Sequence, residues 1–125
     1  MLPRPTDSEL EILTVLWSRG PSTVREIHEI IAKRKPAQYT TVLKTLQIMA
    51  EKVLVRRDEK QRAHIYEAAS PREWTRKQLA GDLLQRAFNG SAARLMQGAL
   101  SSHKASKAEI AELRKMLDEY EKGTR

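Results

Sequence analysis

The sequence predicts a mainly α-helical protein with a small β-hairpin. Apolar residues recur at helical spacing along most of the 125 residues, and glycine and proline are scarce, with five of each. Four segments begin with a capping box, in which Ser or Thr precedes Glu by three residues. Two short β-rich segments separate the third helical pattern from the fourth. Together these observations predict six helices and one hairpin.

Three helices are expected before the hairpin. The first follows Thr6 and ends at Gly20-Pro21, because glycine and proline together terminate a helix. The second runs from about Val24 to Lys33, and the third begins near Gln38. The apolar residues expected to face the core are Leu10, Leu13, Leu16, Trp17, Ile27, Ile30, Ile31, Val42, Leu46 and Met49.

The hairpin is predicted from residues 53–55 and 63–68, which are joined by the charged stretch 56–62. Three helices followed by a hairpin with a basic tip are typical of a winged helix-turn-helix, whose third helix enters the DNA major groove. The hairpin of such a domain, called the wing, contacts adjacent phosphates or the minor groove. We therefore expect residues 1–69 to form an N-terminal winged helix-turn-helix DNA-binding domain.

Residues 70–125 are predicted to form a C-terminal three-helix dimerisation region. Helical patterns cover about 71–88, a segment from Ser91, and a segment from Ser106 to about Lys122. Because such helices cannot form a compact core alone, we expect them to pack against a second copy of the chain. The alternative is that they fold back on the N-terminal domain. The residues expected at the dimer contact are Leu95, Met96, Ala99, Ile110, Leu113, Leu117 and Tyr120.

Positive charge is concentrated in one part of the chain. The formal net charge is +7, and residues 33–62 alone hold nine basic and three acidic side chains. Such a stretch is an electrostatic footprint for a polyanion, most often a nucleic acid. The alternative is a basic face that only contacts solvent.

The exposed face of the third helix is the candidate DNA-reading surface. Hydroxyl groups, cations and apolar side chains on one face can contact phosphates, base edges and thymine methyl groups. A polar face in contact with solvent is the alternative, and the hairpin that follows favours the DNA-reading interpretation. Helical spacing brings together Thr40, Thr41, Lys44 and Ile48, with Gln47 and Lys52 beside them.

Enzymatic and metal-binding functions are not indicated. The chain has no cysteine, which excludes disulfides and thiolate metal sites. His28-Glu29 begins like a zinc-protease helix, but Ala32 stands where the second histidine ligand must be. The sequence also lacks a phosphate-binding glycine loop, a nucleophile elbow and a membrane-spanning apolar run. We expect a soluble, cytoplasmic protein with no cofactor, no enzymatic activity and no membrane contact.

Five segments of the first half carry a family resemblance. They are residues 6–13, 15–17, 20–27, 39–46 and 62–68. In this order they resemble the penicillinase-repressor and methicillin-resistance-repressor family of bacterial winged-helix transcriptional regulators. The resemblance implies a homodimer that binds a pseudo-palindromic operator, commonly with TACA and TGTA half-site cores, and blocks transcription.

The resemblance also implies roles for individual residues. Thr40, Thr41 and Lys44 would face bases or adjacent phosphates. Arg57 and Arg62 would lie on the wing. One position departs from the family pattern, because Val53 follows the third helix where the family usually has glycine. A β-branched residue there is either strained or part of a different turn.

Regulation is the second departure. The best-known repressors of the family are inactivated by a sensor protease that cuts an Asn-Phe bond in the C-terminal region. The corresponding place in this chain is Gly98-Ala99, and the only related pair, Phe88-Asn89, is reversed and lies elsewhere. Cleavage at Gly98-Ala99 by a sensor protease is thus a hypothesis. The copper-responsive branch uses a cysteine-rich C-terminus, which this chain does not have.

The sequence as a whole predicts a sequence-specific transcriptional repressor that binds a double-stranded DNA operator as a homodimer. The alternative is a winged-helix adaptor that binds a protein partner and has no specific DNA binding. The two differ in salt dependence, because a protein that neutralises several phosphates loses DNA affinity steeply as salt rises.

Overall fold

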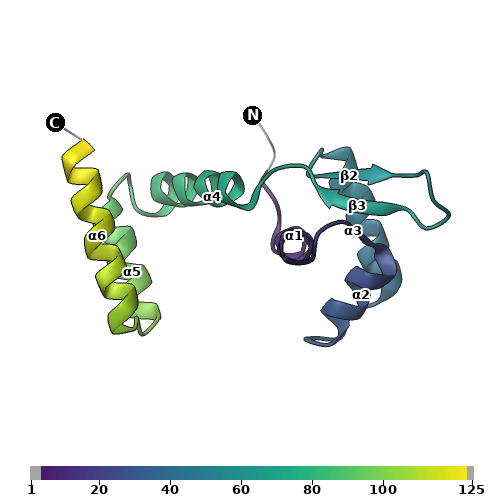
Figure 1. Ribbon diagram of the computed structural model, residues 1–125, viewed down its shortest axis with the longest axis horizontal. Coiled ribbons are helices and arrows are strands. Elements are labelled where there is room, and N and C mark those ends of the chain that lie inside the picture. The colour runs from purple at the N-terminus through teal and green to yellow at the C-terminus, as the bar shows by residue number, and fades with distance from the viewer. Residues whose placement is uncertain (1–3, 124–125) are drawn as a thin grey trace. The chain divides into compact units, whose positions relative to one another are not determined.

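Six helices and three short strands follow one another in the computed structural model, which describes residues 4–123 (Figure 1). This agrees with the prediction of a mainly helical chain with a small β-hairpin. The elements are α1 (Asp7–Arg19), β1 (Ser22–Thr23), α2 (Val24–Ala32), α3 (Tyr39–Glu51), β2 (Val55–Asp58), β3 (Ile65–Ala68), α4 (Arg72–Ala87), α5 (Ala92–Ser102) and α6 (Lys107–Gly123).

The chain divides into two compact units, Met1–Ala80 and Gly81–Arg125. The boundary falls within α4. The beginning of α4 is joined to α1, because the indole N–H of Trp17 donates to the Ser70 carbonyl oxygen at 2.9 Å. Arg72 also donates to the hydroxyl of Ser18, and Thr75 is buried. The predicted domain boundary after residue 69 stays a prediction.

The sheet has one strand more than the sequence predicts. Its antiparallel order is β1-β3-β2, with Ser22 opposite Tyr66 and Val55 opposite Ala68. The strand β1 has only two residues and is defined by its pairing with β3, so no sequence pattern of its own marks it. The sheet closes over α1 and α3, and Tyr66 is almost completely buried beneath it.

The predicted capping boxes at Thr6 and Thr23 are both confirmed. The Thr6 hydroxyl accepts from the Glu9 N–H at 3.2 Å, and the Glu9 carboxylate accepts from the Thr6 N–H at 2.9 Å. Thr23 and Glu26 repeat this arrangement at the start of α2. Each box satisfies backbone N–H groups that have no partner within the helix.

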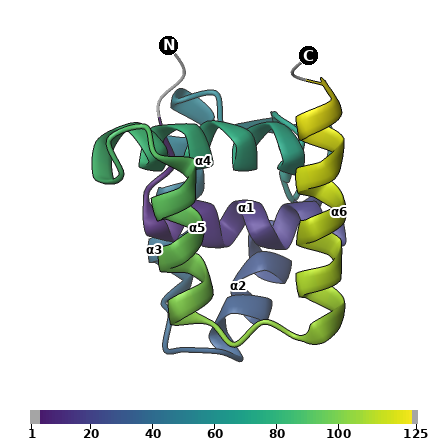
Figure 2. The ribbon, with the colours of Figure 1, turned by 90° about the vertical axis from the view of Figure 1, so that its left-hand side faces the viewer.

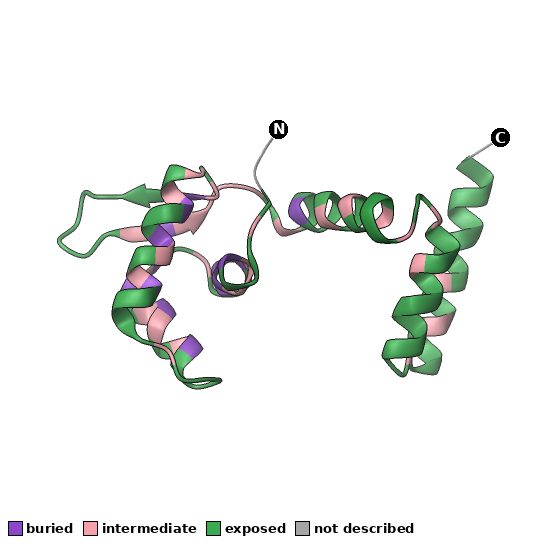
Figure 3. Ribbon diagram, turned by 180° about the vertical axis from the view of Figure 1, so that it is seen from behind, coloured by how far each residue is buried: buried purple, intermediate pink, exposed green. Residues whose placement is uncertain are grey.

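The core lies entirely in the N-terminal unit among the described residues (Figure 3). The inward residues predicted for α3 are confirmed, whereas Leu10, Trp17 and Ile30 are only half-buried at the edge of the core. The buried apolar residues are Ile12, Leu13, Val15, Leu16, Val24, Ile27, Ile31, Val42, Leu46, Met49, Val55 and Tyr66.

The turn after α3 corrects the predicted start of the hairpin. Val53 has a φ of 61°, and the Leu54 N–H donates to the Met49 carbonyl oxygen at 2.9 Å. The Val53 N–H donates to Ala50, which completes a Schellman motif with valine at the left-handed position. The strand therefore begins at Val55 and not at residue 53, and it extends into the charged stretch as far as Asp58.

In the C-terminal unit, α5 and α6 lie side by side and antiparallel (Figure 2). The turn before α5 is built as the sequence predicts, since Asn89 and Gly90 both have positive φ. The Gly90 N–H donates to the Leu84 carbonyl oxygen at 2.9 Å. No residue of α5 or α6 is buried.

Candidate nucleic-acid interface

The outward face of α3 is polar and accessible. Val42, Leu46 and Met49 hold the opposite face in the core. Ile48 is 39% exposed even though it is a large apolar residue, as a contact to a thymine methyl group would require. The exposed residues of this face include the predicted set Thr40, Thr41, Lys44 and Ile48, together with Gln47 and Glu51.

Lys52 has a different environment from the rest of the predicted set. Its ammonium donates to both carboxylate oxygens of Glu9, at 3.1 and 2.9 Å. Glu9 is only 3% exposed. Burial by itself raises the pKa of Glu9, but the hydrogen bond from the Thr6 backbone and the ion pair with Lys52 lower it overall. The ion pair joins the start of α1 to the end of α3 and leaves Lys52 poorly placed to bind phosphate.

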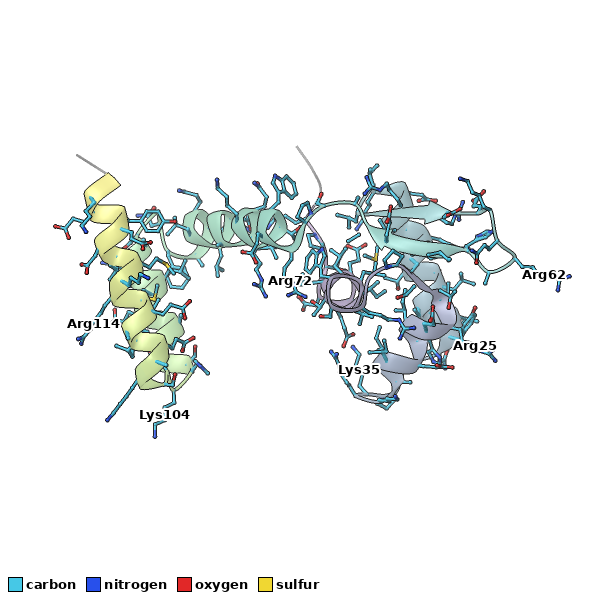
Figure 4. All side chains as sticks on the ribbon, viewed as in Figure 1. Arg25, Lys35, Arg62, Arg72, Lys104 and Arg114 are labelled. Atoms are coloured by element: carbon cyan, nitrogen blue, oxygen red, sulfur yellow. The ribbon has the colours of Figure 1, made fainter. Side chains whose placement is uncertain are left out.

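The two predicted wing arginines also differ. Arg57, in β2, forms an ion pair with Glu59, and its hydrogen bond with Tyr66 and the Glu59 charge raise its pKa. Arg62 lies at the tip of the loop between β2 and β3 and projects outward (Figure 4). Among the described residues its side chain has no ion-pair or hydrogen-bond partner.

Ion pairing divides the nine basic residues of 33–62 into two groups. Carboxylates hold four of them, namely Lys35 with Glu11, Lys52 with Glu9, Arg56 with Glu67 and Arg57 with Glu59. The side chains without such a partner among the described residues are Lys33, Arg34, Lys44, Lys60 and Arg62. The charges of this second group are not balanced by a carboxylate among the described residues.

Sequence reasoning missed two residues beside the α3 face. Arg25, in the first turn of α2, and Tyr39, the first residue of α3, line a surface groove together with Arg62 and His64 of the wing loop. Arg25 lies outside the basic stretch 33–62, and Tyr39 lies just before the residues predicted for the α3 face. The capping box at Thr23 places Arg25 in an exposed first turn, so this position carried a usable signal.

The predicted dimer residues lie on α5 and α6. Leu95, Ile110 and Leu113 are half-buried. The exposed members are Met96, Ala99, Leu117 and Tyr120. The proposed cleavage point, Gly98-Ala99, lies inside α5, and the Ser102 hydroxyl is within 2.9 and 3.1 Å of their two carbonyl oxygens.

Metal sites and membrane-spanning helices were also sought in the part of the chain that the structure describes. Residues 4–123 contain no group of three or more His, Asp or Glu side chains that could hold a metal ion. No helix in the same range is long and apolar enough to cross a membrane.

Comparison with known proteins supplies the family. The family model described as penicillinase repressor matches residues 5–119, which is nearly the whole chain. The chain belongs to the penicillinase repressor family. The family is described as a repressor and its description names no enzymatic activity, in agreement with the prediction.

Relatives within the penicillinase repressor family include "Transcriptional regulator BlaI" from two strains of Mycobacterium tuberculosis, CDC 1551 / Oshkosh and ATCC 25618 / H37Rv. Each is 44% identical over 66 residues, or 52% of this chain and 48% of the relative. The chain therefore spans about half the length of the curated relatives it matches.

A solved structure supports the fold of this penicillinase repressor homologue. The solution structure of the DNA binding domain of the repressor BlaI matches with a TM-score of 0.52 and 19% identity. The match covers 58% of this chain and 88% of that domain. At this identity the likeness shows the fold alone, and the N-terminal winged helix-turn-helix predicted from the sequence is confirmed.

Proposed function

We propose that this chain is a transcriptional repressor that binds a pseudo-palindromic DNA operator as a homodimer. The observation that carries the proposal is the outward face of α3, where Lys44 lies unpaired among exposed hydroxyls and Ile48. This mixture suits the base edges of a major groove, whereas a face that only contacts solvent has no need of an exposed isoleucine. Family membership supports the same function.

In the proposed complex, α3 lies in the major groove and the wing reaches neighbouring phosphates. Thr40, Thr41 and Lys44 contact bases or adjacent phosphates, and Arg62 contacts the backbone from the wing tip. Arg57 and Lys52 act mainly through their ion pairs with Glu59 and Glu9, which stabilise the wing and the end of α3. Bound over a promoter, the protein prevents transcription by occupying the site.

The dimer is proposed to form through α5 and α6. These helices contain no buried residue, and two of their large apolar side chains, Leu117 and Tyr120, are 65% and 70% exposed. A second copy would remove these apolar surfaces from water, and a two-fold dimer would offer two recognition helices to two half-sites. Contacts about one helical turn apart on the DNA are expected from such symmetry.

Relief of repression by a sensor protease is the remaining part of the proposal. A protease needs an extended backbone, whereas Gly98-Ala99 is helical. Cleavage there would require local unfolding of α5, and a glycine in the helix lowers the cost of that unfolding.

Selection of duplexes from a random DNA pool by the full chain, at two salt concentrations, tests the proposal. We expect enrichment of an inverted repeat whose half-sites are about one helical turn apart. If no sequence is enriched and the retained DNA is released at moderate salt, the repressor proposal fails. The protein-adaptor alternative then takes its place.

Lys44→Ala tests the proposed reading face. The variant should lose about tenfold or more of its affinity for the selected duplex and much less for random duplex, because base contacts carry the discrimination. Arg57→Ala is the control, and it should weaken binding to both duplexes alike, because it removes the ion pair with Glu59 that stabilises the wing. Binding constants for each protein on both duplexes provide the measurement. Equal losses on the two duplexes for Lys44→Ala would remove this residue from the reading set.

A further inference from the structure

We infer that the groove between α2, α3 and the wing loop binds one backbone phosphate of duplex DNA through Arg25, Tyr39 and His64. This inference rests on the proposed function and adds Arg25 and Tyr39, to which neither the sequence patterns nor the comparisons assign a role. The groove has a volume of about 450 Å³ and is lined by these three residues together with Arg62. Figure 4 shows Arg25 projecting outward from α2 and Arg62 from the wing tip.

Charge distinguishes this side of the wing from the other. Among the described residues, no carboxylate lines the groove that holds Arg25 and Arg62. The hollow on the opposite side of the hairpin has no net formal charge, because three cations (Arg56, Arg57 and Lys60) line it together with three carboxylates (Asp58, Glu59 and Glu67). A phosphate diester approaching that second side would meet carboxylates. Charge complementarity therefore favours the first side for a DNA backbone.

The donors in the groove are also unused. Among the described residues, the side chains of Arg25, Arg62 and His64 make no ion pair or hydrogen bond. An arginine can offer two parallel N–H donors to the oxygens of one phosphate, and its charge is retained at any physiological pH. The groove thus presents two guanidinium groups and an imidazole with no internal partner.

The ring of Tyr39 packs against His28, and Tyr39 also lines the groove. The His28 ring lies edge-on to the Tyr39 ring, with centroids 5.7 Å apart. His28 is itself fixed, because its Nε2 lies 2.8 Å from the Ala37 carbonyl oxygen in the turn before α3. Tyr39 remains 45% exposed and lines the groove. Its hydroxyl can therefore donate to a phosphate without a large loss of side-chain entropy.

Salt dependence of binding tests the inference with the full chain and the duplex obtained by selection. Arg25→Ala should reduce the magnitude of the slope of log affinity against log salt by about 0.9, the value for one lost phosphate contact. Lys77→Ala is the matched control, because it also removes one exposed cation without a partner among the described residues, but Lys77 lies on α4, outside both the groove and the basic stretch 33–62. We expect its slope to match that of the wild type.

Two further measurements locate the contact. Tyr39→Phe keeps the ring against His28 and removes only the hydroxyl, so we expect about a fivefold loss of affinity, as for one hydrogen bond. Among duplexes that each carry one uncharged methylphosphonate, several should weaken the wild type, and one of them should be the duplex that lacks the phosphate held by Arg25. The same duplex should not weaken Arg25→Ala further, because that variant has already lost the contact.

The outcomes separate this inference from the function on which it rests. If the wild type binds its selected duplex but Arg25→Ala keeps the wild-type slope, the groove is not a phosphate site and the repressor proposal stands. Equal slope losses for Arg25→Ala and Lys77→Ala would also overturn the groove assignment. If the wild type shows no preference for any duplex, the repressor proposal itself fails.

Discussion

At the scale of single residues, Val53 has a strained backbone conformation. Its φ of 61° is unfavourable for a β-branched residue, and its side chain is 62% exposed. Val53→Gly should therefore raise the free energy of unfolding by about 1 kcal/mol, since the relief exceeds the entropy cost of glycine. Urea unfolding should show a higher midpoint with an unchanged slope. Val53→Ala should give a smaller change, and a lower midpoint for the glycine variant would contradict the strain argument.

Glu9 provides a pH-dependent contribution to stability. Its pKa in the folded protein lies below the ordinary value of 4.5, so the stabilisation is present above that pH and is lost as pH falls through the folded pKa. Glu9→Gln should reduce the free energy of unfolding by about 2 kcal/mol at pH 7, because a largely buried ion pair with Lys52 is broken.

The pH profile distinguishes this ion pair from simple packing. Unfolding free energies of wild type and Glu9→Gln should converge as pH falls below about 4.5, where the wild-type carboxylate takes up a proton. Glu29→Gln, on an exposed position of α2, is the control and should change stability little at either pH. A difference at Glu9 that stays constant from pH 7 to pH 3 would rule out the ionic contribution.

At the scale of secondary-structure elements, the helices were predictable and the strands were less so. Capping boxes and periodic apolar residues mark helix starts within the local sequence, and those at Thr6 and Thr23 were confirmed. The strand β1 has only two residues and depends on pairing with β3, which lies more than 40 residues later in the chain. The start of β2 depends on the left-handed Val53, a conformation that valine does not signal.

The candidate interface could likewise be predicted only where it depends on local sequence. Helical periodicity identified the exposed face of α3 because that face is set by the helix itself. Which cations are free is decided by tertiary contacts, such as the pairing of Lys52 with Glu9 across 43 positions of sequence. The groove beside Tyr39 joins α2, α3 and the wing loop, so no local pattern could have revealed it.

The helix α5 carries a prediction about proteolysis. A Cβ atom at Gly98 would meet the Phe88 ring at 3.6 Å, an ordinary van der Waals contact. Gly98→Ala should therefore stabilise α5 by about 1 kcal/mol and slow cleavage near residue 98 by about fivefold. Limited proteolysis followed by mass spectrometry gives the rate at each bond. Gly81→Ala, in α4, is the control, and equal protection of this bond in both variants would contradict local opening of α5.

At the scale of the whole molecule, the prediction concerns dimer formation through the exposed apolar surface of the C-terminal unit. Leu117→Asp should convert the proposed dimer to a monomer, since it places a charge on the exposed apolar residues of α6. Operator affinity should fall by more than 100-fold, because a monomer contacts one half-site only. Sedimentation gives the oligomeric state directly. Ala111→Asp, which adds the same charge elsewhere on α6, should remain dimeric, and a dimeric Leu117→Asp would exclude these apolar residues as the interface.

The two tryptophans of the chain, Trp17 and Trp74, both lie in the unit Met1–Ala80. Trp17 is hydrogen-bonded to Ser70 and half-buried, whereas Trp74 is exposed. Intrinsic tryptophan fluorescence will therefore report melting of the winged helix-turn-helix and release of the start of α4. Neither indole lies on α5 or α6. Loss of self-association through these helices should leave the emission spectrum unchanged while light scattering falls, so the two events can be followed separately in one sample.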